Sequence, residues 1–107
     1  MAQHLGEFEQ LVLMALLRLG ENAYGMSVRE EIASRTGRDV SISAVYTTLE
    51  RLEGKGHAAS RIGEPSAQRG GRRKKHYAVT AGGEAALARS YRALHEMADG
   101  LGLESHS

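Results

Sequence analysis

Residues 42–56 read Ile-Ser-Ala-Val-Tyr-Thr-Thr-Leu-Glu-Arg-Leu-Glu-Gly-Lys-Gly, and this stretch decides the fold. Its apolar residues recur every three or four positions, which is the pattern of a helix with one buried face. These residues are Ile42, Val45, Leu49 and Leu52. Ser43 is expected to cap the helix by accepting a hydrogen bond from a free backbone N–H, and Gly54 and Gly56 are expected to end it. The outward face then consists of Ala44, Thr47, Thr48 and Arg51.

Two further helices are expected before this one. The first has one apolar stripe, formed by Phe8, Leu11, Val12, Ala15, Leu16 and Leu19, and further apolar residues at Leu13, Met14 and Leu17. A helix that is apolar nearly all round is buried on several faces, which in so short a chain indicates a partner subunit. Gly20 is expected to end it. The second helix is expected from Ala23 to Thr36, with Asn22 as its N-cap and Gly37 as its stop. Residues 37–41 then form a short polar turn.

Two short strands are expected after these helices, at about residues 57–61 and 76–79, with a loop rich in glycine and arginine between them. Residues 69–75 read Arg-Gly-Gly-Arg-Arg-Lys-Lys, which carries five positive charges and no negative one. The net charge of the whole chain is only +1. A local basic run on a nearly neutral chain indicates one face that is built for an anionic partner, although such a run is often only a solvated surface.

Thr80 is expected to cap a final helix, which carries apolar residues at heptad spacing. Such a seam is more often plain core, but the small domain and the apolar first helix favour a dimer here. The predicted interface residues are Leu13, Leu17, Leu87, Tyr91, Leu94, Ala98 and Leu101. We therefore divide the chain into residues 1–80, a domain that includes the N-terminal helix, and residues 81–107, a dimerisation helix with a frayed tail.

The order of helix, helix, turn, helix, hairpin and helix predicts a mostly α (α+β) protein, a winged helix-turn-helix with one C-terminal dimerisation helix. The major groove of DNA is about 12 Å wide and admits one α-helix. The third helix has the apolar inner face and slim outer face that such insertion requires. The basic loop supplies a cationic wing tip that can reach the DNA backbone or the minor groove. Residues 1–80 are therefore expected to form a winged helix-turn-helix DNA-binding domain.

Three segments resemble the PadR family of bacterial transcriptional regulators. The first is Ala-Tyr-Gly at residues 23–25, and the third runs from Gly70 to Gly83 as Gly-Gly-Arg-Arg-Lys-Lys-His-Tyr-x-Val-Thr-x-x-Gly. The second consists of Ser43, Val45, Tyr46, Leu49, Arg51, Leu52, Glu53 and Gly56. The resemblance covers roughly residues 8–100. It implies a homodimeric repressor whose recognition helix is residues 43–54 and whose wing is residues 57–79. Thr47 stands where many relatives have proline, and the short C-terminal part resembles the short-tailed branch.

The expected DNA-binding residues come from the third helix and from the wing. They are Ser43, Ala44, Tyr46, Thr47, Thr48, Arg51, Arg69, Arg72, Arg73 and Lys74. Thr47 and Thr48 are the candidates for contacts to base edges, and the wing cations for phosphate or minor-groove contacts. Alternatives stay open: Tyr46 is as suited to the core as to a phosphate, Ser43 to capping alone, and Arg51 to an ion pair with Glu50, Glu53 or Glu84. Tyr24 and Tyr77 are expected to be packed.

The composition excludes several other classes of function. The chain has no cysteine, which excludes disulfides, zinc thiolates and cysteine nucleophiles. His57 and His76 facing each other across the hairpin would be a weak metal site, so we expect no metal and no cofactor. There is no nucleophile elbow, P-loop or convincing carboxylate pair, and we expect no enzyme. No apolar run reaches about 18 residues, so we expect neither a membrane span nor a secretory signal.

We therefore expect a sequence-specific regulator of transcription, acting as a repressor on double-stranded DNA. Its expected location is the cytoplasm, in association with the nucleoid, and its expected partners are DNA and a second copy. The alternative is a winged-helix module for contact with protein or RNA. A small-molecule effector is compatible with the resemblance, but the sequence identifies neither a ligand nor a pocket.

Overall fold

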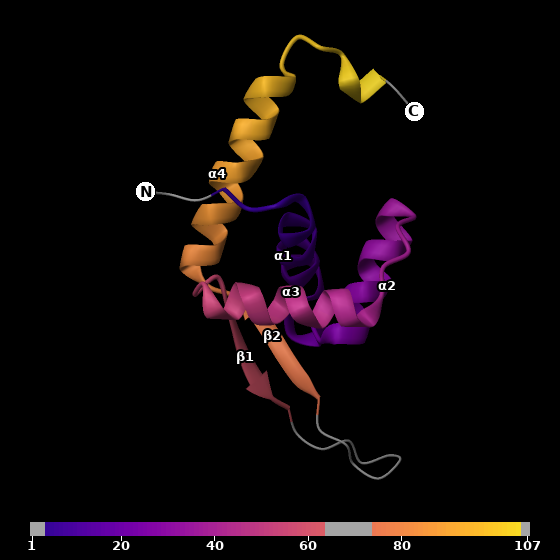
Figure 1. Cartoon of the computed structure of the whole chain (residues 1–107), viewed down its shortest axis with the longest axis vertical. Coiled ribbons are helices and arrows are strands. Elements are labelled where there is room, and N and C mark those ends of the chain that lie inside the picture. The colour runs from indigo at the N-terminus through magenta and orange to yellow at the C-terminus, as the bar shows by residue number, and fades with distance from the viewer. Residues whose placement is uncertain (1–3, 64–73, 106–107) are drawn as a thin grey trace.

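The computed structural model describes residues 4–63 and 74–105. In chain order the elements are α1 (Glu7–Leu19), the 3-10 turn η1 (Gly20–Asn22), α2 (Gly25–Thr36), α3 (Ile42–Gly54), β1 (Ala58–Ile62), β2 (Lys75–Val79), α4 (Ala81–Ala98) and η2 (Leu103–Ser105). The helices α1, α2 and α3 form the body. The outer half of α4 and the hairpin extend from it in opposite directions (Figure 1). This arrangement confirms the predicted order of elements and the predicted mostly α fold class.

The core forms around α1, which packs against α2, α3, β2 and α4. Val12 and Leu13 of α1, Val28 of α2 and Leu49 of α3 are all completely buried within the single chain. The prediction that Leu13 and Leu87 lie in a dimer interface is therefore wrong. Leu13 has no exposed surface and Leu87 is only 7% exposed. Both contribute to the core of this chain instead, because α1 is surrounded by elements from every part of the sequence.

Several predicted helix ends are confirmed and two are displaced. Gly20 and Gly37 end α1 and α2 with φ values of 60° and 73°, a left-handed backbone that suits glycine. The N-cap of α2 is Tyr24 rather than Asn22, because the Ser27 hydroxyl accepts a hydrogen bond from the Tyr24 N–H at 2.9 Å. The N-cap of α3 is Ser41 rather than Ser43.

The turn between α2 and α3 explains the displaced cap of α3. Ser41 has an extended backbone, and its hydroxyl accepts a hydrogen bond from the Ala44 N–H at 3.1 Å. The turn before it is held by Arg29, whose Nε donates to the Val40 carbonyl at 2.7 Å and whose guanidinium lies 3.6 Å from Asp39. Ser43 therefore lies inside the first turn of α3, where its side chain is exposed.

The hairpin is a two-stranded antiparallel sheet in which Ala58 pairs with Val79 and Arg61 with His76. His57 and His76 do not face each other across the hairpin, because His57 precedes β1 and the register places Arg61 opposite His76. Tyr77 is buried beneath the hairpin, as predicted. Within residues 4–63 and 74–105 there is no group of three or more side chains that could hold a metal ion.

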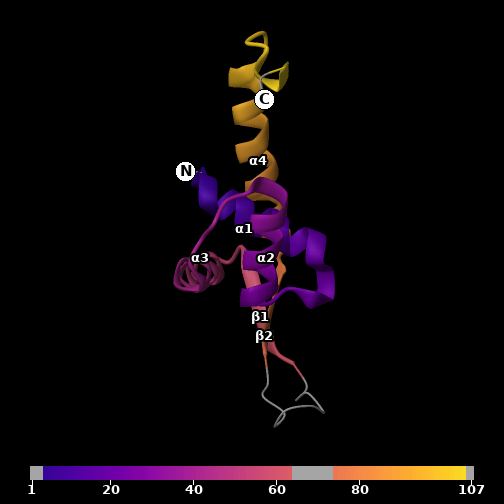
Figure 2. The same ribbon diagram turned by 90° about the vertical axis from the view of Figure 1, so that its right-hand side faces the viewer.

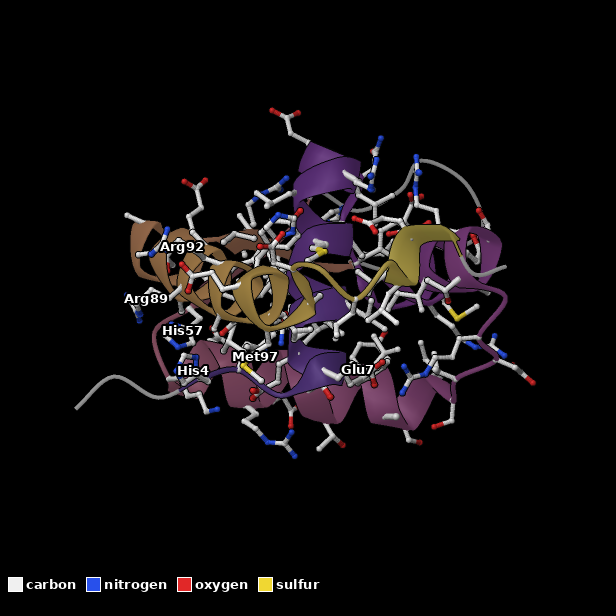
Figure 3. All side chains as sticks on the ribbon, turned by 90° about the horizontal axis from the view of Figure 1, so that it is seen from above. His4, Glu7, His57, Arg89, Arg92 and Met97 are labelled. Carbon is white, nitrogen blue, oxygen red and sulfur yellow. The ribbon has the colours of Figure 1, made fainter. Side chains whose placement is uncertain are left out.

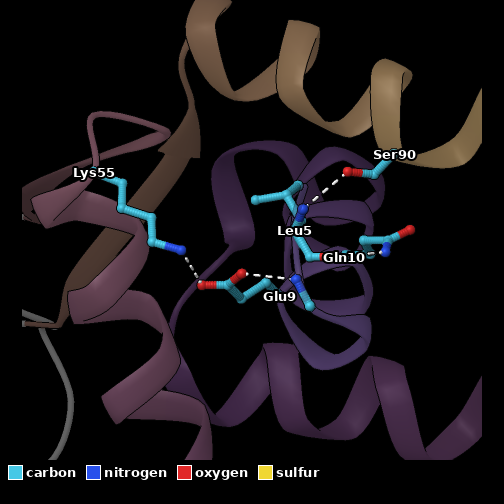
Figure 4. A network of polar contacts seen from close by, with 6 residues as sticks. Leu5, Glu9, Gln10, Lys55 and Ser90 are labelled. Atoms are coloured by element: carbon cyan, nitrogen blue, oxygen red, sulfur yellow. Dashed lines mark hydrogen bonds and ion pairs between the residues drawn. The ribbon is translucent and has the colours of Figure 1, made fainter. Parts of the chain in front are cut away.

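Polar contacts fasten α4 and α3 to the start of the chain (Figure 4). The Leu5 N–H donates to Ser90 Oγ of α4 at 3.0 Å. The Lys55 ammonium, just after α3, donates to the buried Glu9 carboxylate at 2.9 Å. The helix α4 itself ends at Ala98, and Gly100 has a φ of 83°. Leu101, a predicted member of the helical seam, therefore lies beyond the helix.

The lowered pKa of Glu9 predicts that the free energy of unfolding decreases in acid. Burial alone would raise the pKa of Glu9, but the hydrogen bonds from Lys55 and the Gly6 N–H, with the charges of Lys55 and Arg51, outweigh it and lower this pKa. Because the folded pKa lies below the unfolded value, the contribution is present above about pH 4.5 and is lost as the pH falls through the folded pKa.

We expect Glu9→Gln to destabilise the protein by about 1–3 kcal/mol at pH 7, because the Lys55 ammonium is left without its charged acceptor. The difference from the wild type should shrink between pH 7 and a pH below the folded pKa of Glu9, because the wild-type carboxyl becomes protonated as well. Urea midpoints at the two pH values measure this, and the exposed Glu30→Gln is the control. A difference that did not depend on pH would contradict the role of the charge.

Candidate nucleic-acid interface

The outward face of α3 lies at the edge of the molecule. Seen end-on in Figure 2, α3 stands apart from the other helices, and the hairpin extends past it. The exposed residues of its first three turns are Ser43, Ala44, Tyr46, Thr47, Glu50 and Arg51. The side chains of Ser43, Ala44 and Thr47 are small, so another macromolecule can approach the backbone of the N-terminal half of α3 closely.

Thr48 does not belong to this face, and its predicted outward position is wrong. The residue is only 4% exposed. It follows Val45 by three positions and precedes Leu52 by four, which places it in the buried stripe of the helix. Its polar side chain suggested an outward position, but the periodicity of the helix decides where it lies. Of the two threonines, only Thr47 is exposed on the outward face of α3.

Tyr46 is packed on one side and exposed on the other. Its ring packs against α2 at Gly25, where a Cβ would lie 2.4 Å from Tyr46 Cζ. The residue nevertheless remains 41% exposed. Tyr46 is therefore a packing residue on one side, and on the other it presents surface at the border of the outward face of α3.

The contacts of the charged residues of α3 differ from the ion pairs that the sequence suggested for Arg51. Among the residues that the structure describes, none forms an ion pair with Arg51, which is exposed. Glu53 instead accepts a hydrogen bond from the Ser60 hydroxyl at 2.6 Å and lies 4.0 Å from the Lys75 ammonium. Glu50 shares the outward face and was missed as an interface residue. Its spacing of seven from Ser43 was the available signal.

The wing is described only in part. Arg69, Arg72 and Arg73 lie outside the described residues, so their assignment remains a prediction. Lys74 is exposed where the chain re-enters the hairpin, and its Nζ lies 4.2 Å from the centre of the Tyr24 ring. The Gly63 N–H donates to the Lys74 carbonyl at 2.8 Å, which fixes the backbone of Lys74 at the hairpin.

The remaining dimer candidates form two separate groups. Tyr91, Leu94 and Leu101 are 57%, 60% and 62% exposed, although all are apolar or aromatic. Leu94 borders a groove of about 270 Å³ between α4 and the N-terminal segment, with Met97 on the same rim. Figure 3 labels Met97 near His4, and it shows Arg89 and Arg92 towards another side of α4. Leu17 borders a different groove, beside β2. Ala98 is half-buried.

In residues 4–63 and 74–105 no helix is both long and apolar enough to cross a membrane.

Several solved structures are similar to this chain. A PadR family regulator from Eggerthella lenta is 27% identical, with a TM-score of 0.69, and the match covers 94% of this chain and 88% of that chain. A PadR-like regulator from Bacillus cereus is 17% identical, with a TM-score of 0.73 and coverage of 94% and 92%. Bacillus subtilis PadR, solved in complex with operator DNA, is 24% identical, with a TM-score of 0.65 and coverage of 78% and 45%. A comparison with curated proteins gives no match.

The family assignment rests on the sequence itself. Residues 12–89 match the family profile of the PadR-like transcriptional regulators. This range contains α2, α3, the hairpin and the first half of α4, and it includes the three segments whose resemblance the sequence suggested. Since the matched range is most of the 107 residues, the chain belongs to the PadR-like family of transcriptional regulators.

Proposed function

We propose that the protein is a homodimeric repressor that inserts α3 into the major groove of double-stranded DNA. The observation that carries the proposal is the contrast between the two faces of α3. The outward face has small exposed side chains at Ser43, Ala44 and Thr47. On the other face Val45, Leu49 and Leu52 are completely buried. The complex of the Bacillus subtilis relative with operator DNA supports it. We infer that the protein acts by occupying DNA in the cytoplasm, at the nucleoid, rather than by catalysis.

The proposed contacts differ in what they provide. Thr47 would meet base edges through its hydroxyl and methyl groups, with Ser43 and Ala44 allowing the close approach. Tyr46 and Arg51 border this face and would meet phosphates or bases. Glu50 can accept a hydrogen bond from the amino group of cytosine and repels phosphates elsewhere, so it would contribute to sequence preference. Lys74 and the arginines of residues 69–73 would supply affinity that does not depend on sequence.

The proposed dimer uses the exposed side of α4. Tyr91, Leu94 and Met97 leave a large apolar surface on a helix that extends from the body, and exposed apolar patches mark interaction sites. Two recognition helices related by a two-fold axis would then read half-sites about 34–36 Å apart. Spacing between half-sites would add discrimination to the few base-reading side chains of α3.

The experiment that tests this function is selection of duplex DNA from a random pool, followed by measurement of affinity against salt concentration. We expect an enriched palindromic site and an affinity that falls steeply with salt. A preference for single-stranded RNA would favour the alternative winged-helix module. So would a protein that binds no nucleic acid but captures a protein partner. Equal affinity for all duplexes would contradict operator recognition.

The wing arginines provide a further prediction. Replacing Arg69, Arg72 and Arg73 together by alanine should weaken binding to every duplex sequence. It should also flatten the slope of log affinity against log salt by about 0.9 for each phosphate that is no longer neutralised. The control is Arg89→Ala with Arg92→Ala, which removes exposed charges from α4. An unchanged slope in the triple variant would remove the wing from the interface.

A further inference from the structure

The Ala-Tyr-Gly segment at residues 23–25 has no role in the function proposed so far, although it lies where three elements meet. It connects η1 to α2. The Tyr77 N–H of β2 donates to the Ala23 carbonyl at 2.9 Å, so the segment is bonded to the hairpin. Gly25 is buried against α3. The same three residues therefore contact both elements that the proposed function places on DNA.

Tyr24 makes the contact with the wing. It pairs with His76 of β2 through an isolated antiparallel bridge, and the two rings are 5.6 Å apart in an edge-to-face arrangement. The Lys74 ammonium lies 4.2 Å from the centre of the Tyr24 ring, within the range of a cation–π interaction. The backbone of Lys74 is held as well, because its carbonyl accepts a hydrogen bond from the Gly63 N–H. Tyr24 thus holds an exposed cation at the base of the wing.

Gly25 makes the contact with α3. A Cβ at this position would lie 2.4 Å, 2.5 Å and 2.6 Å from Cζ, the hydroxyl oxygen and Cε1 of Tyr46. These distances are far shorter than any non-bonded contact allows, so the tyrosine ring can occupy its place only because residue 25 has no side chain. An alanine there would displace the ring, and because Tyr46 is partly exposed the ring can swing outward without unfolding the chain.

We propose that Tyr24 and Gly25 are positioning residues for DNA binding, which set the base of the wing and the Tyr46 ring of α3 from one shared segment. This inference rests on the proposed function, because it takes α3 and the wing as the DNA-binding elements. Neither residue needs to touch DNA. Their effect would pass through Lys74 and Tyr46, so their substitutions should not add to substitutions of those two residues.

The first test is a double-mutant cycle of Gly25→Ala with Tyr46→Ala. Affinity is measured by fluorescence anisotropy on a duplex of about 30 base pairs, long enough for two half-sites one helical turn apart. We expect Gly25→Ala alone to weaken binding about tenfold, the scale of one side-chain contact to DNA. In the Tyr46→Ala background it should cause no further weakening. Met26→Ala, next in α2 and exposed, is the control and should leave affinity unchanged.

The second test is the pair Tyr24→Leu and Lys74→Met on the same duplex. Each is expected to weaken binding, and each to reduce the salt slope by about 0.9, the value for a single neutralised phosphate. The double variant should be no weaker than Lys74→Met alone. Tyr24→Phe keeps the ring and should restore wild-type affinity, whereas a merely structural role for residue 24 would leave the salt slope of Tyr24→Leu unchanged.

The outcomes separate this inference from the proposed function. If the wild type binds duplex DNA and the effects in either pair are fully additive, the positioning role of that residue is overturned. If the wild type binds no duplex DNA, the proposed function fails and the DNA-positioning role fails with it. Urea unfolding of the Gly25 and Tyr46 variants then still shows whether the close approach exists, since Gly25→Ala should destabilise only the chain that retains the Tyr46 ring.

Discussion

Replacing Gly83 with alanine is expected to destabilise the protein by about 3 kcal/mol, the upper end of what overpacking usually costs. A Cβ at this position would lie 2.0 Å from the His57 carbonyl oxygen and 2.9 Å from Val79 Cγ1. The carbonyl cannot move aside freely, because it accepts a hydrogen bond from the Thr80 N–H at 3.0 Å. The first turn of α4 would have to shift away from the hairpin. The midpoint of urea unfolding measures the loss of stability.

The neighbouring glycine provides a matched control. Gly82 lies in the same turn of α4, but a Cβ there would meet its nearest atom, the Gly56 carbonyl oxygen, at an ordinary 3.6 Å. Gly82→Ala should therefore be neutral or stabilise the helix by up to about 1 kcal/mol, because alanine is the better helix former. Equal destabilisation in the two variants would show that the contact between α4 and His57 is not the cause.

Replacing Leu94 with aspartate is expected to convert the proposed dimer into a monomer. Leu94 is 60% exposed in the single chain, so the monomer should tolerate the change. In the dimer the carboxylate would be buried without a partner, which costs about 3–5 kcal/mol. That cost raises the dissociation constant of the dimer roughly a hundredfold or more. Light scattering across a concentration series would show the lower mass, and affinity for a palindromic duplex should fall with it.

The control for this substitution places the same charge elsewhere on α4. Ala85 is exposed, and its spacing of nine from Leu94 puts it nearly on the opposite face of the helix. Ala85→Asp should leave the mass of the dimer unchanged. A dimer that survived Leu94→Asp would remove the exposed side of α4 from the interface. If both variants were monomers, the cause would be the added charge itself and not its position on α4.

Helix order and the hairpin could be predicted from the sequence because they depend on local periodicity and on glycine stops. The places where the prediction failed depend on contacts between distant residues. Ser41 and Ser43 are both able to cap α3, and the choice follows from the turn that Arg29 holds through Val40. Leu13 has the same character as the exposed Leu17, and only the packing of four other elements around α1 distinguishes them.

The candidate interface was predictable to a similar extent. Residue type suggested that Thr48 faces outward, whereas its position in the stripe of Val45 and Leu52 buries it. Residue type favours Glu50 as a partner for Arg51 over a position facing DNA, because a carboxylate repels the phosphate backbone. The close approach of Gly25 to Tyr46 joins two helices, and no spacing in a single helix reveals it.

The tight packing at Gly83 determines how accurately the far end of α4 is positioned. The 18 residues of α4 span about 27 Å, at 1.5 Å per residue. If the helix tilted by about 10° at its root, its far end would move by roughly 5 Å over that length, more than the rise of about 3.4 Å between successive bases of a strand. In the proposed dimer, α4 therefore determines the spacing between the two recognition helices. The absence of a side chain at residue 83 lets the base of α4 fit closely against the body, which keeps this spacing constant.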